Sequence, residues 1–455
     1  MDIHVLKFGG TSMNDHKTWK QVLEVIKKYE YPVVVVSATA RTTRQLVEAG
    51  KLAASGKLDE AMAISEDIKE RHAAIVHQFL LANPHEKNAL IEESCIVKLN
   101  QKIDRLHTFL KYAAKQGELK AGMQDSIAAI GEQISSFLLA QCGLALGLLT
   151  QHIDAKKLIK TDANYGNAKP NTMLISQKIG SLETIMEDGF TPVIGGFYGE
   201  APNGTITTLG FEGSDYTASL LGGALQAKTI EIWTDVSGIF TCDPHQIENA
   251  LPIAKLSYFD ATEMAYFGAK VLHPSTLKPA QERNIPVLVK NIFKPEDEGT
   301  LIIRESKSTK PALAISLKKN IALITISAYE TVMGYNFLTR VFKHLEELRI
   351  TADAINTTEA SVTIAIADSE RLDEFATDFI EVGSVVLNRN KALISIIGCQ
   401  LSNANELNTN ILNPIADVNL DMISFSKEKR IFNVVVEEET LIETAQHIHT
   451  KLFEH

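Results

Sequence analysis

The sequence has no apolar run long enough to cross a membrane. The longest run covers residues 137–149 and contains Gln141 and two glycines, whereas a membrane-spanning helix needs about 20 apolar residues. At the N-terminus, Lys7 and two glycines interrupt the apolar residues almost at once, which is not the pattern of a signal peptide. We therefore expect a cytoplasmic protein without a membrane partner, in which residues 137–149 form a buried helix.

The sequence also has few cysteines and no excess of positive charge. Its four cysteines are far apart and form no CxxC pair: Cys95, Cys142, Cys242 and Cys399. This spacing predicts reduced thiols rather than a disulfide framework or a zinc site. The formal charge of −11 argues against a nucleic-acid partner.

Several catalytic and nucleotide-binding motifs are absent. There is no GxGxxG and no GxxxxGK[ST], so neither the dinucleotide fingerprint nor the P-loop applies. There is no HExxH and no GxSxG either, which removes the signatures of zinc proteases and serine hydrolases. With 45% apolar and 22% charged residues, the chain has the composition of an ordinary globular protein. Its 455 residues suggest two or three domains.

Residues 1–302 alternate strand-like and helix-like segments. Helices are expected at 58–80 and 86–115, and strands are expected at 31–38, 190–197, 229–236 and 285–292. Strands joined by helical crossovers predict an α/β fold, in which helices sandwich a mostly parallel sheet.

Residues 303–312 are charged and broken by proline, which indicates a linker. After it, the order β-α-β-β-α-β occurs once and then again more weakly, which predicts two α+β ferredoxin-like modules at 313–388 and 389–455. Such modules would bind an effector or a partner subunit. The alternative is a single α+β domain without a ligand.

The stretch KFGGTS at residues 7–12 is the first candidate for chemistry. Buried strands seldom contain lysine, and paired glycines weaken a strand, so a negative group such as a phosphate is expected to approach the backbone here. The alternative is a tight turn with a solvated lysine. A second glycine loop at 207–219 contains Gly210 and Gly213 before Ser214 and Asp215, and it would either bind an anion or simply cap a helix.

Two later stretches extend this pattern. In 233–245, Thr234 and Asp235 follow a buried strand, where ligand-binding loops of open sheets lie, and they could hold a nucleotide ring or ribose. In 267–277, Lys270 lies between a glycine and Pro274, near an expected helix end. A lysine in such a place is more often solvated than a ligand.

Together these motifs resemble the aspartate kinases (aspartokinases) of the amino acid kinase family. The matching stretches are KFGGTS (7–12), IDAKKLIKTD (153–162), GSDYTA (213–218), WTDVSGIFTCDP (233–244) and FGAKVLHP (267–274). The two C-terminal modules look like the paired ACT domains of the same enzymes. The resemblance implies an ATP- and Mg²⁺-dependent phosphotransferase that makes 4-phospho-L-aspartate, the first step toward lysine, threonine and methionine.

The resemblance also implies roles for individual residues. Catalysis would fall to Lys7, Gly9, Gly10 and Asp215, and the substrate would contact Thr11, Ser37, Arg41, Thr43, Phe211 and Glu132, the last of which meets the amino group. The nucleotide would contact Lys7, Gly10, Ser214, Asp215, Thr234, Asp235, Phe240, Asp243 and Lys270. No protein metal ligand is expected. Inhibitory lysine or threonine would bind at Phe337, Leu338, Asp353, Thr357, Thr358 and Glu359, and the ACT modules would form a homodimer or homotetramer.

The sequence departs from the family at the expected substrate pocket. Phe211 stands where the family commonly has a carboxylate-binding arginine, while Arg41 and Arg44 stand at a glycine and an asparagine position. Phe240 and His245 also replace the more usual tyrosine and arginine of the nucleotide loop. Three explanations stay open: Arg41 or Arg44 supplies the missing cation, the substrate is a different amino or carboxylic acid, or the kinase half is a degenerate regulatory subunit.

Overall fold

The computed structural model describes residues 1–266, 272–306, 312–329, 336–358, 361–369, 371–380, 383–399, 408–428 and 430–454. Contacts divide the chain into two compact units, which are described separately. The first unit comprises Met1–Ile239, Ala254–Tyr258 and Val271–Ser306. The second comprises Phe240–Ile253, Phe259–Lys270 and Lys307–His455. This division differs from the predicted border at residue 302, because two segments before that border pack with the C-terminal half.

An eight-stranded sheet forms the centre of the first unit, in the order β3-β4-β2-β1-β7-β9-β10-β8. Every neighbouring pair is parallel except β9 and β10, so the predicted fold class is confirmed. The central strands are mostly apolar because both of their faces are covered, and Lys7 on β1 and Glu231 on β7 are buried exceptions. The bounds are β1 Ile3–Phe8, β2 Tyr31–Val36, β3 Thr150–Ile153, β4 Thr191–Gly195, β7 Thr229–Thr234, β8 Lys255–Ser257, β9 Val287–Asn291 and β10 Thr300–Ile303. A separate hairpin consists of β5 Tyr198–Glu200 and β6 Ile206–Thr208.

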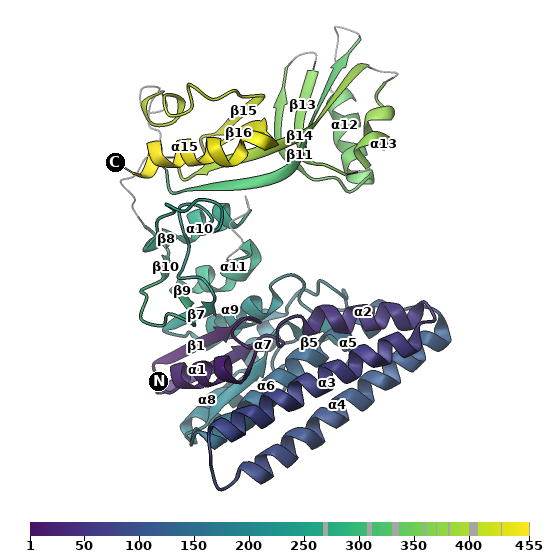
Figure 1. Ribbon diagram of the computed structural model, residues 1–455, viewed down its shortest axis with the longest axis vertical. Coiled ribbons are helices and arrows are strands. Elements are labelled where there is room, and N and C mark those ends of the chain that lie inside the picture. The colour runs from purple at the N-terminus through teal and green to yellow at the C-terminus, as the bar shows by residue number, and fades with distance from the viewer. Residues whose placement is uncertain are drawn as a thin grey trace. The chain divides into compact units, whose positions relative to one another are not determined.

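Two long helices in the first unit, α3 and α4, run alongside each other (Figure 1) and match the predictions at 58–80 and 86–115. Their buried faces share one apolar core with α1, α2, α6 and the sheet. The helices of this unit are α1 His16–Ile26, α2 Thr42–Ala54, α3 Leu58–Ala82, α4 Asn88–Gln116, α5 Ala121–Ala128, α6 Ile130–Ala145, α7 Thr172–Lys178, α8 Gly180–Glu187, α9 Gly213–Leu225 and α11 Pro274–Arg283. Helix α10, Tyr258–Tyr266, belongs to the second unit from Phe259 on.

The stretch Ala121–Ala145, which comprises α5 and α6, is long and apolar enough by composition to cross a membrane. In the structure, 83% of its most apolar window is buried inside the protein. It is therefore a core helix, as predicted for residues 137–149, although α6 ends at Ala145.

Backbone hydrogen bonds join the carboxyl ends of four parallel strands in the first unit. Gly9 N–H donates to the carbonyl of Trp233 (3.1 Å), and Ser37 N–H donates to that of Phe8 (3.0 Å). Gly196 N–H donates to the carbonyl of Val36 (2.9 Å). The loops after β1, β2, β4 and β7 therefore begin at one edge of the sheet, which is where ligands bind in open α/β sheets.

The second unit is built on a six-stranded antiparallel sheet, in the order β12-β13-β11-β14-β16-β15. Its strands are β11 Ala314–Ala328, β12 Ala352–Thr357, β13 Ser361–Ala367, β14 Gly383–Ile397, β15 Met422–Ser426 and β16 Ile431–Glu437. Its helices α12 Asn336–Glu347, α13 Arg371–Thr377 and α15 Leu441–Phe453 cover this sheet (Figure 1), and a single π-helical turn covers Asn408–Leu412.

Two apolar cores divide this sheet into the two expected α+β modules, but the modules are not simply consecutive in the chain. Residues 321–327 of β11 pair with β13, and Ile324 packs with α12 and α13. Residues 314–318 of the same strand pair with 393–397, and Ile315 packs in the core that contains α15. The second module thus takes one of its strands from a segment that precedes the first module.

Residues 240–253 are also part of the core around α15. Cys242 and Ile247 belong to that core, and Thr241 Oγ1 lies 2.8 Å from His449 Nε2. The carbonyl of Thr241 accepts a hydrogen bond from Ile315 N–H at 2.6 Å. In the same unit, Asp260 forms an ion pair with Arg430. A segment that directly follows a strand of the kinase-like sheet is therefore built into the C-terminal unit.

Candidate active site

A cleft of about 420 Å³ lies at the carboxyl edge of the first unit's sheet. Most of the residues predicted from the motifs to bind substrate or phosphate line it, together with Glu212 and the exposed Arg44. These predicted lining residues are Gly10, Ser37, Arg41, Thr43, Glu132, Phe211, Ser214 and Asp215.

Lys7 and Asp215 form a buried ion pair beside this cleft. Lys7 Nζ donates a hydrogen bond to Asp215 Oδ2 at 2.9 Å and lies 2.8 Å from Oδ1. Each residue is only 7% exposed. Lys7 lies near the end of β1 and Asp215 in the first turn of α9, so the ion pair ties the central strand to the N-terminus of that helix. A fixed cation next to a helix N-terminus favours an anionic ligand.

The glycines after β1 leave space next to this cation. A Cβ atom at Gly9 would lie 3.6 Å from Lys7 Nζ, and one at Gly10 would lie 3.5 Å from the carbonyl of Ala38. Both are ordinary contacts, so neither packing nor a left-handed backbone demands glycine at these positions. The missing side chains keep the backbone accessible to a ligand. Thr11, which was predicted to contact substrate, is exposed in the turn that follows.

Glu132 on α6 is a buried carboxyl group that lines the cleft. It is 4% exposed, and Thr43 Oγ1 lies 3.5 Å from its Oε1 atom. Its Oε2 atom is buried and has no hydrogen-bond partner among the residues that the structure describes. Burial raises the pKa of Glu132 to about 8. A buried acceptor without a partner is costly, and a ligand ammonium group would satisfy it.

Close packing fixes α6 against the loop after β2. A Cβ atom at Gly131 would lie 2.8 Å from Cβ of Ala38, so glycine is needed for this approach. Ser135 Oγ donates a hydrogen bond to the carbonyl of Ser37 at 2.8 Å. Glu132 therefore lies next to the loop that carries Ser37, Arg41 and Thr43.

Arg41 adopts a left-handed backbone geometry that favours glycine, the residue that the motif resemblance implies at this position. Its φ angle is 68°, in the left-handed region, and it precedes the first residue of α2. Its side chain is exposed and lines the same cleft as Phe211. Phe211 is 78% exposed, and its ring contacts the ring of His273 with centroids 6.0 Å apart. The cleft thus has an apolar side chain where the family has a cation, and it has two arginines from the loop after β2.

Glu212 is a second carboxyl group of the cleft that the motifs did not predict. Its φ angle of 51° is left-handed, and within the described part of the chain its buried Oε2 atom has no hydrogen-bond partner. Burial and the neighbouring charge of Asp215 raise the pKa of Glu212 to about 7. The only signal in the sequence is an acidic residue between Gly210 and Gly213.

The predicted nucleotide residues fall in three groups. Thr234 ends β7 and Asp235 follows it; because β7 pairs with β1, both residues lie at the same sheet edge as Lys7. Phe240 and Asp243 belong to the second unit, where the Asp243 carboxylate accepts a hydrogen bond from His245 N–H at 2.9 Å. Lys270 lies outside the described residues.

The predicted effector residues lie in the first module of the second unit. Phe337 and Leu338 are in the first turn of α12, and their side chains pack against the core of that module. Asp353 on β12 forms an ion pair with Lys318 at 2.6 Å. Thr357 is the last residue of β12 and Thr358 follows it. Glu359 lies outside the described residues.

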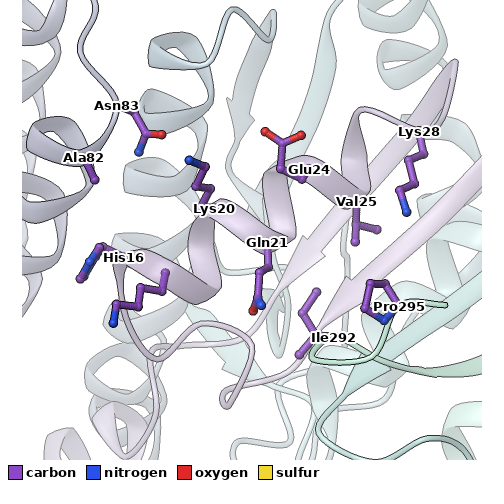
Figure 2. Close-up of a pocket in the computed structure, with 11 residues that line it drawn as sticks. His16, Lys20, Gln21, Glu24, Val25, Lys28, Ala82, Asn83, Ile292 and Pro295 are labelled. Atoms are coloured by element: carbon purple, nitrogen blue, oxygen red, sulfur yellow. The ribbon is translucent and has the colours of Figure 1, made fainter. Parts of the chain in front are cut away.

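A separate hollow of about 460 Å³ lies over α1. Figure 2 shows Lys20, Gln21, Glu24 and Val25 along that helix and Lys28 just after it, with Asn83 directly after α3 and Pro295 in the segment after β9. None of the residues predicted from the motifs lines this hollow. The cleft beside Lys7 is therefore the candidate active site.

Comparison with known proteins identifies the family. Residues 2–291 match the amino acid kinase family. The chain is 32% identical to aspartokinase 1, chloroplastic, of Arabidopsis thaliana over 471 residues, which cover 99% of this chain and 80% of the relative. The chain belongs to the aspartokinases. As an aspartokinase it is a phosphotransferase, so the resemblance stated from the motifs is confirmed.

Two solved structures of Escherichia coli aspartokinase III resemble this aspartokinase over its whole length. One, in complex with lysine and aspartate in the T-state, has a TM-score of 0.84 at 28% identity and covers 100% of both chains. The other, in complex with aspartate and ADP in the R-state, has a TM-score of 0.81 at 28% identity and covers 99% of this chain and 100% of the other.

Proposed function

We propose that this aspartokinase transfers the terminal phosphoryl group of ATP to the side-chain carboxylate of L-aspartate, which gives 4-phospho-L-aspartate and ADP. The buried Lys7–Asp215 pair beside the cleft is the observation that carries the proposal, because it fixes a cation where the phosphoryl group would be transferred. The aspartate and ADP in one E. coli relative support the same reaction.

The reaction needs neutralised charge rather than a base. The aspartate side chain is already ionised at neutral pH, with an ordinary pKa of about 3.9, so its oxygen can attack the γ-phosphorus without losing a proton. The bond between that phosphorus and the β–γ bridging oxygen breaks, and ADP leaves. Lys7 and the backbone amide of Gly10 would neutralise the two anions as they approach, since the Gly9 N–H already donates to the carbonyl of Trp233.

Mg²⁺ would enter with the nucleotide. Among the described residues no group of three or more His, Cys, Asp or Glu side chains could hold a metal ion. Mg²⁺ is commonly bound by substrate phosphates and one or two carboxylates. Bound in this way, it would offset phosphate charge, with Asp215 as the buried carboxylate nearest to Lys7.

The substrate's own charged groups match the side chains of the cleft. The unpartnered Oε2 atom of Glu132 would accept the ammonium group, after Glu132 has lost its proton. Arg41 or Arg44 would bind the α-carboxylate in place of the arginine that Phe211 replaces, since both line the cleft. This assignment favours an active aspartate kinase over a changed substrate or a degenerate subunit.

We further propose that lysine inhibits the enzyme by binding at the first module of the second unit. The lysine in the T-state structure of the E. coli relative supports this amino acid over threonine. We also expect a homodimer or homotetramer that forms through the C-terminal sheet, where Val386, Ile423 and Phe425 are exposed. Light scattering at micromolar concentration tests the assembly, and a monomer would contradict it.

A coupled ADP-release assay with Mg·ATP tests the reaction. Hydroxylamine trapping of the acyl phosphate separates phosphoryl transfer from ATP hydrolysis. The acid panel should include L-aspartate, L-glutamate, D-aspartate and succinate, with lysine and threonine as added effectors. Aspartate should be the best acceptor. A different best acceptor would show a changed substrate, and no trapped acyl phosphate with any acid would show a degenerate subunit.

A further inference from the structure

Arg71 on α3 makes three contacts with residues 39–45, which comprise the end of the loop after β2 and the first residues of α2. One guanidinium nitrogen donates a hydrogen bond to the carbonyl of Ala40 at 3.0 Å. The other donates to Thr42 Oγ1 at 3.0 Å and to Gln45 Oε1 at 2.7 Å. Ala40 and Thr42 are the chain neighbours of Arg41, so one side chain holds the backbone before that residue and the side chain of the residue after it.

The residue between these two contacts has a strained backbone. A left-handed φ such as the 68° of Arg41 is unfavourable for a residue with a Cβ atom, and it persists only where the surroundings hold it. Arg41 has no side-chain hydrogen bond that caps α2. Burial and the neighbouring charge of Arg41 lower the pKa of Arg71, so the two guanidinium groups repel each other. Arg71 therefore acts on the backbone of this turn rather than on the Arg41 side chain.

The next residue of α3 holds the preceding part of the loop. His72 is fully buried, with its Nε2 atom 2.8 Å from Thr39 Oγ1 and its Nδ1 atom 2.6 Å from the carbonyl of Ile68. Residues 38–40 in turn pass close to Gly10, because a Cβ atom there would lie 3.8 Å from Cα of Ala40. The path of this loop thus shapes both the substrate cleft and the turn after β1.

We propose that Arg71 is a positioning residue for the substrate: it holds Arg41 in its left-handed turn and thereby fixes the loop 39–45 that lines the cleft. The claim that this loop binds aspartate rests on the proposed function. The claim that Arg71 holds the turn does not rest on the proposed function, and it can be tested without an activity measurement.

Steady-state kinetics test the first claim. Arg71→Met keeps the volume of the side chain and removes its donors, so kcat/KM for aspartate should fall at least about tenfold, whereas KM for ATP should stay within about twofold. Arg71→Lys should recover only part of the loss, because one ammonium group cannot reproduce a planar fork of donors. Lys69→Met is the matched control on the same helix, where Lys69 makes a half-buried ion pair with Glu66 at 3.4 Å. An unchanged kcat/KM for aspartate, or an equal loss for ATP, would overturn the positioning role.

Trypsin tests the second claim, because it cuts after Arg44 only when this loop opens locally. In the protein that retains Arg41, Arg71→Met should raise the cleavage rate after Arg44 by about tenfold. In an Arg41→Gly background the same change should raise it less than threefold, since glycine adopts the left-handed turn without help. Equal increases in both backgrounds would contradict the proposal. If wild type makes no aspartyl phosphate but the cleavage pattern holds, the proposed function fails and the role of Arg71 in the turn stands.

Discussion

The ammonium group of Lys7 lies 2.8 Å from a carboxylate oxygen of Asp215, although 208 residues separate the two in the chain. Both side chains are buried, so each charge depends on the other. Removal of one partner from such a pair leaves an uncompensated charge, which typically destabilises a protein by about 3–5 kcal/mol. The pair therefore connects the stability of the first unit to the group that is proposed to meet the phosphate.

Lys7→Met should abolish most of the catalysis and also destabilise the fold. We expect kcat to fall by at least about a hundredfold, since the variant loses a cation that would stabilise the transferring group. Isothermal titration should still detect nucleotide binding in samples that remain folded. Normal turnover by Lys7→Met would show that the assignment of Lys7 is wrong.

The double variant Lys7→Met/Asp215→Asn separates these two effects. It leaves no unpaired buried charge, so it should recover most of the free energy of unfolding that Lys7→Met loses. Its kcat should remain as low as that of the single variant. Recovery of activity together with stability would mean that Lys7 serves only the fold.

Glu132→Gln should change the pH dependence of stability. The folded chain holds a proton on Glu132 up to its pKa of about 8, whereas the unfolded chain releases that proton near the ordinary value of 4.5. Between these values the unfolded state binds fewer protons, so this group makes wild type lose stability as the pH rises, by at most about 1.4 kcal/mol per pH unit. Chemical denaturation from about pH 5 to about pH 8 should therefore show that the free energy of unfolding of Glu132→Gln rises relative to that of wild type as the pH increases.

The same variant should weaken substrate binding. An amide cannot supply the negative charge that an ammonium group needs, so KM for aspartate should rise about ten- to a hundredfold, while KM for ATP should change little. Thr43→Val is a suitable comparison, because it removes only the 3.5 Å contact to Oε1. An unchanged KM for aspartate would mean that the amino group binds elsewhere.

The arginines of the cleft should contribute more to kcat/KM for aspartate than Phe211 does. If Arg41 or Arg44 binds the α-carboxylate, Arg41→Gln or Arg44→Gln should lower kcat/KM for aspartate about ten- to a hundredfold. Phe211→Arg should then change it less than about threefold, because the carboxylate already has a partner. A large gain from Phe211→Arg, with no loss from either glutamine variant, would show instead that the pocket has drifted from aspartate.

Ile247→Ala should destabilise the C-terminal unit, although residue 247 precedes the predicted linker. Ile247 is fully buried in the core that contains α15, and such a truncation typically costs about 2–5 kcal/mol. Hydrogen exchange should speed up in Leu441–Phe453 and remain unchanged in β1 and β2. The control is Ile68→Ala, because the Ile68 side chain is fully buried in the core of the first unit. This variant should speed up exchange in β1 and β2 and leave Leu441–Phe453 unchanged.

The sequence predicted the sheet and much of the candidate site because both depend on local signals. Apolar runs located β2, β4, β7 and β9, although the predicted strands extended past the turns that end them. Motif residues such as Lys7, Asp215 and Glu132 come close together because parallel strands end at one edge. Their mutual distances could not be read from spacing, since those depend on the path of the whole chain.

Other features had no local signal. Arg71 is one charged residue on a long amphipathic helix, and only the path of the loop after β2 brings it next to Ala40 and Thr42. The left-handed backbone of Arg41 contradicts the preference of its own side chain and depends on those contacts. Cys242 and Ile247 are ordinary apolar residues, and nothing near them in the sequence indicates which core they join.

The segment 240–253 leaves a kinase strand, joins the C-terminal core and then returns to the first unit. A protein cut at residue 302 would therefore carry Cys242 and Ile247 without the core that buries them. Exchange of regulatory halves between related enzymes would meet the same obstacle. A C-terminal half taken from one enzyme would leave behind the residues of its core that lie within that enzyme's kinase region. Chimeras of this enzyme should transfer residues 240–253 together with the C-terminal half.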